Sequence, residues 1–301
     1  MTDYIKGLVS AIITTHNRKD LVVKAIKSVL AQSYSNIECI VIDDASDDGT
    51  ECYISQFIED GVIYHYIPKE ESKGGNHARN KGLELAKGEI IAFLDDDDEW
   101  LPSKIEKQVR CLSESIGFVY CGRVFEYDGD RNNLSYEAIG DVKYKEGDLS
   151  KEVLVHVVCV TSTMLVLHQL IDDVGCFDEQ LKAWQEYDLS IRLLQITKAA
   201  VVRENLIIYR VQKSDKNRNT NNIQKWIKSA KIVETKYADL YKQLDRKDIY
   251  RHKLYKSIDG YNRAKNANNA MIVLKFMLKI FLDPRTLLVA LEKKLHPERG
   301  V

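Results

Sequence analysis

Four consecutive aspartates, Asp95 to Asp98, follow the apolar run EIIAFL and form the most unusual cluster in the sequence. Carboxylates a few ångströms apart repel one another, and the end of a buried strand solvates them poorly. A divalent cation removes that repulsion, and oxygen-only ligands favour Mg²⁺ or Mn²⁺ held together with water and substrate phosphates. The alternative is a solvated acidic loop that caps a helix beginning near Pro102. We favour the metal site because the run closes a buried strand.

Three further polar clusters stand out beside the aspartate run. They are TTHNR at 14–18, DDAS at 43–46 and WQEYD at 184–188. In an open parallel sheet, ligands bind beyond the carboxyl ends of the strands, so clusters at such ends are expected to meet in one crevice. We interpret DDAS as a pair of carboxylates that contacts polar ligand groups, with an ordinary turn and helix N-cap as the alternative.

The usual glycine signatures of phosphate binding are missing from the sequence. There is no GxxxxGK[ST] motif, and the segment KGGNHARNKG at 73–82 does not fit GxGxxG. This argues against kinases, nucleoside triphosphatases and dinucleotide-dependent enzymes. A nucleoside diphosphate is therefore expected to be held by a metal ion and by scattered donors.

The elements that must position these clusters alternate along the chain. Apolar runs predict strands at 8–15, 37–44, 62–66, 89–96 and 118–121, and helical spacing predicts helices at 20–32, 49–60, 76–87 and 102–114. This alternation indicates an α/β fold with a mostly parallel sheet, and strands that are apolar throughout indicate helices on both faces. Further strands are predicted at 159–166, 200–204 and 206–211, with a helix within 181–197 and helical structure after 221.

The overall composition is that of a globular protein. The 301 residues are 45% hydrophobic and 30% charged, and no uncharged apolar run approaches the roughly 18 residues that a spanning helix needs. The six cysteines are scattered without a CxxC motif or a Cys/His cluster. They are interpreted as reduced thiols, which predicts a cytoplasmic protein without a disulfide framework or a zinc site.

The charge is distributed unevenly. Residues 1–200 carry 21 Lys and Arg against 35 Asp and Glu, whereas residues 201–301 carry 23 against 10. A basic tail on an acidic body predicts an anionic partner, such as phospholipid, a diphosphate-linked substrate or nucleic acid. Nucleic acid is the least favoured of these, because the tail lacks a module of interleaved stacking aromatics. The segment MIVLKFMLKIFL at 271–282 suits a helix lying at a membrane interface, and packing on the catalytic domain or a dimer contact is the alternative.

Five ordered blocks closely resemble family 2 glycosyltransferases of the GT-A fold, over about residues 8–210. They are SAIITTHNR, IVIDDAS, GGNHARNKGLELAKGEIIAFLDDDD, VGCFDE and WQEYDLSIRL. The resemblance implies a metal-dependent, inverting hexosyltransferase of the bacterial surface-polysaccharide type that uses a nucleotide-diphospho-sugar, most often a UDP-sugar, with Mg²⁺ or Mn²⁺. It also implies a Rossmann-like catalytic domain over 1–215, with a nucleotide-sugar half at about 1–120 and an acceptor half at about 121–215. A basic helical region over 216–301 follows.

The resemblance assigns roles at the nucleotide end of the site. His16 occupies the place of an aromatic ring against uracil, Asp44 accepts a hydrogen bond from the base beside Asp43, and Arg79 matches a basic residue near the nucleotide. The expected nucleotide-binding residues are Thr15, His16, Asn17, Arg18, Asp43, Asp44, Arg79, Asp95 and Asp96.

The resemblance also assigns the aspartate run to the DxD motif. Asp95 usually contacts the ribose, Asp97 holds the metal at the diphosphate, and Asp96 shares the ribose role, so the expected metal ligands are Asp97 and Asp95. Gln212 stands where relatives often have a histidine near the metal. The basic segment 213–218 is expected either to cover the diphosphate or to be a solvated loop.

At the acceptor end, the family uses the second residue of an Glu-Asp pair as the general base. The aligned residues here are Gln185 and Glu186, so Glu186 is the candidate base, with Asp188 as the second choice. Trp184 is either a platform for a sugar ring or a core residue. The expected acceptor and sugar contacts are Trp184, Gln185 and Asp188.

These expectations favour a glycosyltransferase, peripheral to the inner face of the cell membrane, that builds a polysaccharide on a glycan or lipid-linked acceptor. One alternative is a polyprenyl-phosphate glycosyltransferase of the dolichyl-phosphate-mannose-synthase type, which usually takes GDP-mannose. Another is an inactive subunit that only binds sugar nucleotides. The oligomeric state, the donor sugar and the linkage are left open.

Overall fold

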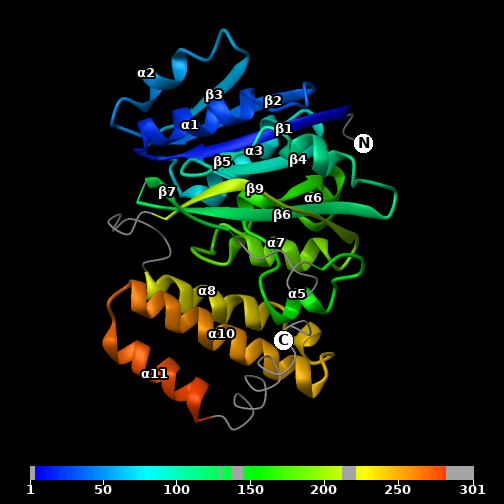
Figure 1. The fold of residues 1–301 in the computed structure, drawn as a ribbon, viewed down its shortest axis with the longest axis vertical. Helices are drawn as coiled ribbons and strands as arrows, with labels where there is room; N and C mark the ends of the chain where they lie inside the picture. Colours follow the sequence, from blue (N-terminus) through cyan, green and yellow to red (C-terminus); the bar gives the residue numbers. More distant parts are fainter. Residues whose placement is uncertain (1–3, 129, 137–144, 212–221, 283–301) are drawn as a thin grey trace.

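The protein is represented by a computed structural model that describes residues 4–128, 130–136, 145–211 and 222–282. Within these residues the centre of the molecule is a nine-stranded sheet in the order β3-β2-β1-β4-β8-β6-β9-β5, with β7 paired to β6 (Figure 1). The strands are β1 Ile5–Thr15, β2 Ile37–Asp44, β3 Val62–Ile67, β4 Gly88–Asp95, β5 Glu99–Trp100, β6 Ile116–Tyr127, β7 Asp130–Tyr136, β8 Leu165–Leu167 and β9 Lys198–Val211.

The first half of the sheet confirms the predicted α/β pattern. β1 pairs in parallel with β2 and β4, and β2 pairs in parallel with β3. The connecting helices are α1 Lys19–Leu30, α2 Thr50–Ser55 and α3 Gly75–Leu85. Ile12 belongs to one buried cluster while Ala11 and Ile13 belong to the other, because successive side chains of a strand point to opposite faces. Both faces are covered, which explains why these strands are apolar throughout.

The second half of the sheet is mixed and differs in detail from the prediction. β8 runs antiparallel to β4 and β6, while β6 and β9 are parallel. The strand predicted over 159–166 is largely wrong, because 161–163 form a 3₁₀ turn and only 165–167 are extended. Side chains hold this turn: Trp100 Nε1 donates to the carbonyl of Ser162 at 2.9 Å, and Ser162 Oγ donates to Asp98 at 2.5 Å. The two strands predicted over 200–211 are one strand with a register irregularity.

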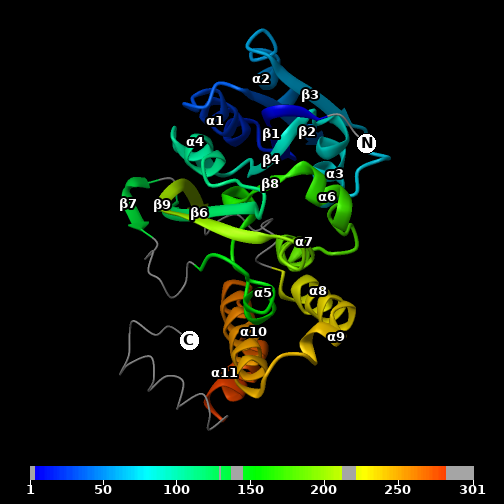
Figure 2. The same ribbon diagram turned by 90° about the vertical axis from the view of Figure 1, so that its right-hand side faces the viewer.

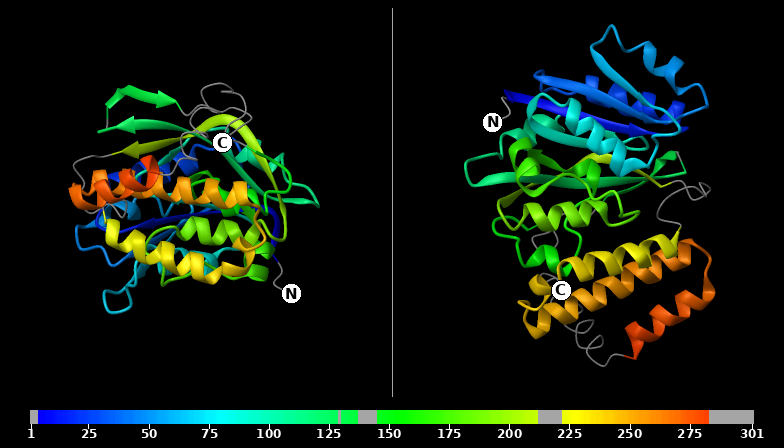
Figure 3. Two further views of the ribbon diagram at one scale, coloured as in Figure 1. Left: turned by 90° about the horizontal axis from the view of Figure 1, so that it is seen from below. Right: turned by 180° about the vertical axis from the view of Figure 1, so that it is seen from behind.

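The remaining helices lie at the margins of the sheet and below it. They are α4 Lys104–Val109, α5 Glu152–Val155, α6 His168–Val174, α7 Gln185–Leu193, α8 Ile223–Lys236, α9 Ala238–Tyr241, α10 Arg246–Asn266 and α11 Ala270–Phe281. Figures 2 and 3 show that α8, α10 and α11 form a helical layer beside α7, on the side away from β1 to β3. None of the helices in the described ranges is both long and apolar enough to cross a membrane.

The helical layer is joined to the rest of the molecule by a buried aromatic cluster. The ring of Trp226 on α8 lies 5.4 Å, centre to centre, from Trp184 and 5.9 Å from Phe276 on α11, edge to face in both pairs. Gly260 on α10 lets Phe276 approach, because a Cβ at that position would lie 2.5 Å from the ring. The helices therefore share one hydrophobic core with the sheet. The expected boundary at residue 215 falls outside the described residues.

Candidate active site

A pocket of about 970 Å³ opens at the carboxyl ends of β1, β2 and β4. Its other walls come from the beginning of α3, the beginning of α7, and helices α8 and α10. Most of the candidate residues line this pocket, as expected for a ligand site beyond the carboxyl ends of parallel strands. They are Thr15, His16, Asn17, Arg18, Asp44, Arg79, Asp95, Asp96, Asp97, Trp184, Gln185 and Glu186. The structure thus brings together clusters from distant parts of the chain.

The nucleotide end is formed by two loops that follow β1 and β2. His16 Nδ1 lies 2.5 Å from the backbone oxygen of Asp44, and the backbone N–H of Asn17 donates to Ser46 Oγ at 2.8 Å. Asn17 and Ala45 both adopt positive φ angles, which turn the two loops sharply. Asp44 Oδ1 is buried, and none of the described residues donates a hydrogen bond to it. A buried acceptor without a partner suits a ligand N–H.

Asp43 is a correction to the expected nucleotide set. Its side chain is buried and does not line the pocket. Its carboxylate accepts from the backbone N–H of Ser46 at 2.9 Å and from the hydroxyl of Tyr64 at 3.0 Å. Adjacent strand residues point to opposite faces, so Asp43 stabilises the turn after β2 while Asp44 meets the pocket.

Two arginines neutralise much of the aspartate run. Arg79 Nη2 lies 2.5 Å from Asp95 Oδ1, and Arg18 Nη1 lies 2.9 Å from Asp96 Oδ1 and 3.3 Å from Asp97 Oδ2. The repulsion that the sequence implies is therefore relieved in part by protein cations. The aspartate run does not depend on a metal ion alone to be tolerated.

Burial favours the protonated, uncharged forms of two of these aspartates. It raises the pKa of Asp96 to about 7, against the opposing effect of the Arg18 charge. Burial also raises the pKa of Asp98 well above its usual range, although Ser162 Oγ and the backbone N–H of Arg210 donate to it. Asp98 was absent from the expected site and lies beneath it, so only the other three aspartates line the pocket.

Asp95 and Asp97 are the carboxylates available for a metal ion. Their side chains keep 32% and 20% of their surface exposed. Among the described residues, no group of three or more His, Cys, Asp and Glu side chains is arranged to hold a metal. The donors are all oxygens, which suits Mg²⁺ or Mn²⁺ completed by water and substrate phosphates. On donor chemistry the two residues fit such an ion.

Glu186 lies in the first turn of α7 and faces the same pocket. Its charged and titratable neighbours are Arg79, Asp95, Cys159, Tyr255 and Arg263. Burial raises the pKa of Glu186 above its usual value, while the charges of Arg263 and Arg79 oppose that rise. A carboxylate with a raised pKa is a stronger proton acceptor, provided that nearby cations keep it ionised.

Trp184 precedes α7 and has a positive φ of 60°. Only 1% of its surface is exposed. The ring lies edge to face with Trp226 and with Tyr187, and its Nε1 donates to Asp259 Oδ2 at 3.0 Å. Its contact with the pocket is therefore small, and the packing supports the core interpretation over the sugar platform.

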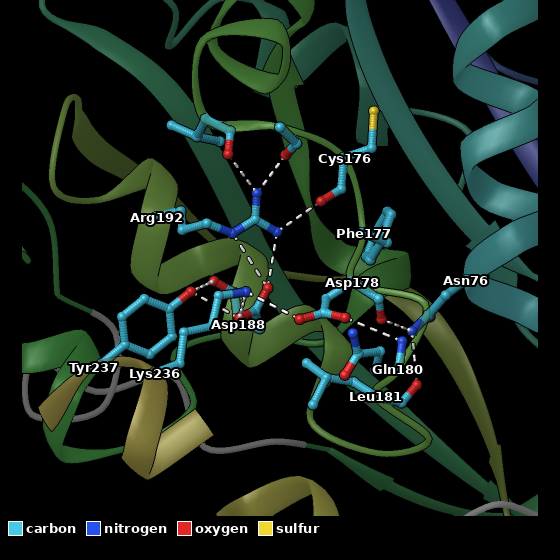
Figure 4. A network of polar contacts seen from close by, with 12 residues as sticks. Asn76, Cys176, Phe177, Asp178, Gln180, Leu181, Asp188, Arg192, Lys236 and Tyr237 are labelled. Atoms are coloured by element: carbon cyan, nitrogen blue, oxygen red, sulfur yellow. Dashed lines mark hydrogen bonds and ion pairs between the residues drawn. The ribbon is translucent and has the colours of Figure 1, made fainter. Parts of the chain in front are cut away.

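Asp188 is a correction to the expected acceptor set. It is fully buried and absent from the pocket wall. As Figure 4 shows, one carboxylate oxygen accepts from Lys236 and Tyr237 at 2.8 and 2.7 Å, and the other accepts from Arg192 Nη2 at 2.8 Å. Side chains two positions apart on a helix lie on different faces, so Asp188 points into the helical layer while Glu186 faces the pocket. Asp188 joins α7 to α8 through these contacts.

The same network extends to the nucleotide half. Lys236 also contacts Asp178 at 3.1 Å, and Asn76 Nδ2 on α3 donates to the backbone oxygens of Asp178 and Leu181, both at 2.9 Å. Figure 4 shows these groups converging between α3, α7 and α8. The loop that leads into α7 is thus held from both sides, which fixes the position of Glu186.

Four basic residues of the pocket wall were missed by the sequence reasoning. They are Lys73, Lys182, Lys225 and Arg263. The basic character of the chain after residue 200 covers Lys225 and Arg263 but names no position, and Lys73 and Lys182 lie in the acidic first 200 residues. Gln212 and the basic segment 213–218 lie outside the described residues, so the expectations about them stay predictions.

With the site described, the chain can be compared with known proteins. Residues 10–173 match the family model named "Glycosyl transferase family 2", which is more than half of the chain. The chain belongs to that family. The matched region holds the strand ends of this glycosyltransferase, from His16 to the aspartate run, and ends before α7.

Two relatives match this glycosyltransferase over different lengths of its chain. An uncharacterized glycosyltransferase of Rickettsia typhi is 35% identical over 209 residues, 68% of this chain and 64% of the relative. A UDP-Glc:α-D-GlcNAc-diphosphoundecaprenol β-1,3-glucosyltransferase of Escherichia coli, WfaP, is 40% identical over 122 residues, 40% of this chain and 48% of the relative. The matches therefore span less than two thirds of these relatives.

A solved structure confirms the fold. The mannosyltransferase PcManGT of Pyrobaculum calidifontis, in complex with GDP-Man and Mn²⁺, superposes with a TM-score of 0.62 over 97% of this chain and 81% of that chain. The sequence identity is 18%, so the likeness concerns the fold. The predicted GT-A α/β architecture with C-terminal helices is confirmed.

Proposed function

We propose that this protein transfers a sugar, with inversion, from a nucleotide-diphospho-sugar to a glycan or lipid-linked acceptor in bacterial polysaccharide synthesis. The observation that carries the proposal is that one pocket holds Asp44, Asp95, Asp97 and Glu186. These are the groups needed to bind a nucleoside diphosphate and to accept a proton. The name of the relative WfaP, a transferase from UDP-Glc to a diphosphoundecaprenol-linked sugar, supports a UDP-sugar and a lipid-linked acceptor.

In this proposal the donor binds to residues at the carboxyl ends of the strands. Asp44 offers its unpartnered buried oxygen to an N–H of the uracil, beside His16. Thr15, Asn17 and Arg18 line the same end, with Arg79 and the aspartates farther along β4. In this arrangement strand ends within residues 1–120 bind the donor, and the start of α7 with α8 and α10 supplies the acceptor side.

Asp95 and Asp97 are the residues that would hold Mg²⁺ or Mn²⁺. When bound, the ion supplies positive charge against the charge that develops on the leaving diphosphate. The protein contributes Arg18 and Arg79, whose ion pairs hold the carboxylates at the pocket. The Mn²⁺ complex of the neighbour PcManGT is consistent with this assignment.

Glu186 acts as the general base. The acceptor oxygen forms its bond to the anomeric carbon, the bond from that carbon to the diphosphate oxygen breaks, and the electron pair leaves with the nucleoside diphosphate. The proton of the acceptor hydroxyl passes to the Glu186 carboxylate. Attack from the face opposite the leaving group inverts the anomeric carbon. Arg263 and Arg79 favour the ionised form that the base requires.

The direct test is a donor screen with the unaltered protein and Asp97→Asn. We expect thermal stabilisation by UDP and UDP-sugars with Mn²⁺, slow hydrolysis of one UDP-sugar, and loss of both Mn²⁺-dependent effects in Asp97→Asn. Stabilisation by GDP and hydrolysis of GDP-mannose instead would favour the polyprenyl-phosphate alternative. Binding without any hydrolysis or transfer would favour the inactive subunit.

The membrane partner is proposed from α11. Four apolar side chains repeat along this helix at three- and four-residue spacing and remain exposed: Met271 82%, Leu274 55%, Leu278 47% and Phe281 72%. Lys275 and Lys279 lie between them. This pattern suits a helix at the surface of an anionic membrane, on the cytoplasmic side where sugar nucleotides are found.

A vesicle sedimentation assay tests this contact. We expect the protein to bind vesicles containing phosphatidylglycerol, and the double variant Met271→Ser/Phe281→Ser to lose most of that binding. Ile58→Ser, which removes an exposed apolar side chain on the opposite side of the sheet, is the matched control. Equal binding by the double variant and the control would contradict a membrane role for α11.

A further inference from the structure

One wall of the pocket is basic and is assembled from four separate segments. Lys73 precedes α3, Lys182 precedes α7, Lys225 lies on α8 and Arg263 lies on α10, and all four line the pocket. The three lysine side chains are exposed, and within the described residues none of them has a carboxylate at ion-pair distance. Arg263 lies 2.8 Å from Asp259. We call these four residues the basic wall.

The basic wall differs from the cations at the donor end. Arg18 is paired with Asp96 and Asp97, and Arg79 is paired with Asp95. The charges there are compensated within the protein, whereas the three lysines of the basic wall present uncompensated charge. Residues 1–200 carry a net charge of −14, so this concentration of positive charge is a local feature. Uncompensated cations around one pocket attract an anionic ligand.

Three residues of the basic wall lie at the start of α7 or beyond it, on α8 and α10. The fourth, Lys73, precedes α3, and its backbone oxygen accepts from Lys182 Nζ at 3.0 Å. Asp259 on α10 accepts from Trp184 Nε1 at 3.0 Å and also pairs with Arg263, so it joins the start of α7 to the basic wall. The donor residues follow β1, β2 and β4, while α8 and α10 lie beyond α7 on the other side, as Figure 1 shows. A ligand bound toward α8 and α10 is therefore placed beside the start of α7, which carries Glu186.

We propose that the basic wall binds the diphosphate of a lipid-diphosphate-linked acceptor and so orients its sugar hydroxyl toward Glu186. The inference rests on the proposed function, because it takes Glu186 as the base. Lysine and arginine are the usual partners of phosphate oxygens, and several cations suit a group with two adjacent phosphates. The acceptor named for the relative WfaP, a diphosphoundecaprenol-linked sugar, has this chemistry.

The probe is geranyl diphosphate, a water-soluble prenyl diphosphate, titrated by calorimetry into protein saturated with UDP and Mn²⁺. We expect Lys182→Gln/Lys225→Gln to weaken geranyl diphosphate binding by about tenfold or more, because two charge-assisted contacts to phosphate oxygens are lost. UDP affinity should change by less than about twofold. Lys231→Gln removes the same charge from α8 outside the pocket and should bind both ligands like the unaltered protein.

Several results would overturn the proposal. If the double variant loses affinity for UDP and retains it for geranyl diphosphate, the basic wall serves the diphosphate of the donor. Unchanged binding of both ligands, no binding of geranyl diphosphate by the unaltered protein, or an equal loss in Lys231→Gln would exclude a specific acceptor site. Failure of the proposed function is seen separately, as absence of UDP binding and donor hydrolysis in the unaltered protein. Neither of those measurements depends on the lysines.

Discussion

The donor end and the acceptor end of the pocket are built in different ways. The donor end is formed at the carboxyl ends of β1, β2 and β4, where each polar cluster directly continues an apolar strand. The acceptor end is formed by the start of α7 together with α8 and α10. Its residues Lys225 and Arg263 lie within helices and belong to no polar cluster that marks them in the sequence. The clusters of the donor end are each recognisable in the local sequence, whereas the residues of the acceptor end come together only when the helices pack.

The two ends also balance charge differently. At the donor end, Arg18 and Arg79 pair with the aspartates, so the groups are held in place before any ligand arrives. At the acceptor end, the buried carboxylate Asp188 is paired with Arg192 and Lys236, whereas the exposed lysines of the basic wall are left for a ligand. The ion pairs thus position side chains before a ligand binds, and in our proposal the exposed lysines bind the acceptor. The two carboxylates of α7 make the sharpest test of this distinction.

The largest effect is expected from Glu186→Gln. If Glu186 accepts the proton of the acceptor, its amide variant should lower turnover by about 10²–10⁴-fold, because a general base contributes that much. UDP affinity should be retained, since the residue contacts neither the base nor the diphosphate. The measurement is single-turnover transfer with saturating donor, accompanied by calorimetric titration of UDP.

Glu186→Asp is the control for that experiment. It keeps the carboxylate and shortens the side chain by one methylene, so part of the rate should return. Near-normal turnover of Glu186→Gln would remove the residue from the mechanism.

A large loss of stability is expected from Asp188→Asn. The substitution removes a charge that Arg192 and Lys236 contact in the interior, and breaking a buried ion pair destabilises by about 3–5 kcal/mol. Urea denaturation should report this change as a lower free energy of unfolding. Glu186→Gln, two residues away, should leave the unfolding midpoint nearly unchanged. A catalytic defect in Asp188→Asn with full stability would contradict the assignment of Asp188 to positioning.

A moderate effect is expected from Asp44→Ala at the donor end. Loss of a hydrogen bond to a charged group costs about 1.5–3 kcal/mol, so UDP affinity should fall by at least about tenfold. Asp43→Asn is the neighbouring comparison, and it should act on stability, because Asp43 contacts Ser46 and Tyr64 outside the pocket. Equal UDP affinity in Asp44→Ala and the unaltered protein would place the base pocket elsewhere.

The smallest effect concerns pH. Burial raises the pKa of Glu186, and the base must be ionised to accept a proton. Turnover should therefore fall as the pH is lowered through this raised pKa, at a higher pH than the value of about 4.3 of a free glutamate. Arg263→Gln removes a charge that favours ionisation and should move the acidic limb of the profile to higher pH. If the acidic limb is unchanged in Arg263→Gln, the pH profile of turnover does not report the ionisation of Glu186.

Most of the fold could be predicted from the sequence. The apolar runs predicted β1 to β4 closely, because these strands are buried on both faces and their parallel pairing follows from the intervening helices. The segment 159–166 could not be predicted, since its turn depends on a hydrogen bond donated by Trp100 and another accepted by Asp98, about 60 residues earlier in the chain. Local pattern contains no information about such partners.

The sequence by itself determined which strand ends form the donor end, because the polar clusters at 14–18, 43–46 and 95–98 directly continue apolar strands of a parallel sheet. Tertiary structure decided which carboxylate of a pair meets the pocket, so that Asp44 and Glu186 do and Asp43 and Asp188 do not. It also decided the basic wall, since Lys73 and Arg263 are 190 residues apart in the sequence and line one pocket only because α10 packs against α8 and its Asp259 accepts from Trp184 before α7. Side-chain direction and long-range packing are properties of the folded core, and charge composition alone cannot specify them.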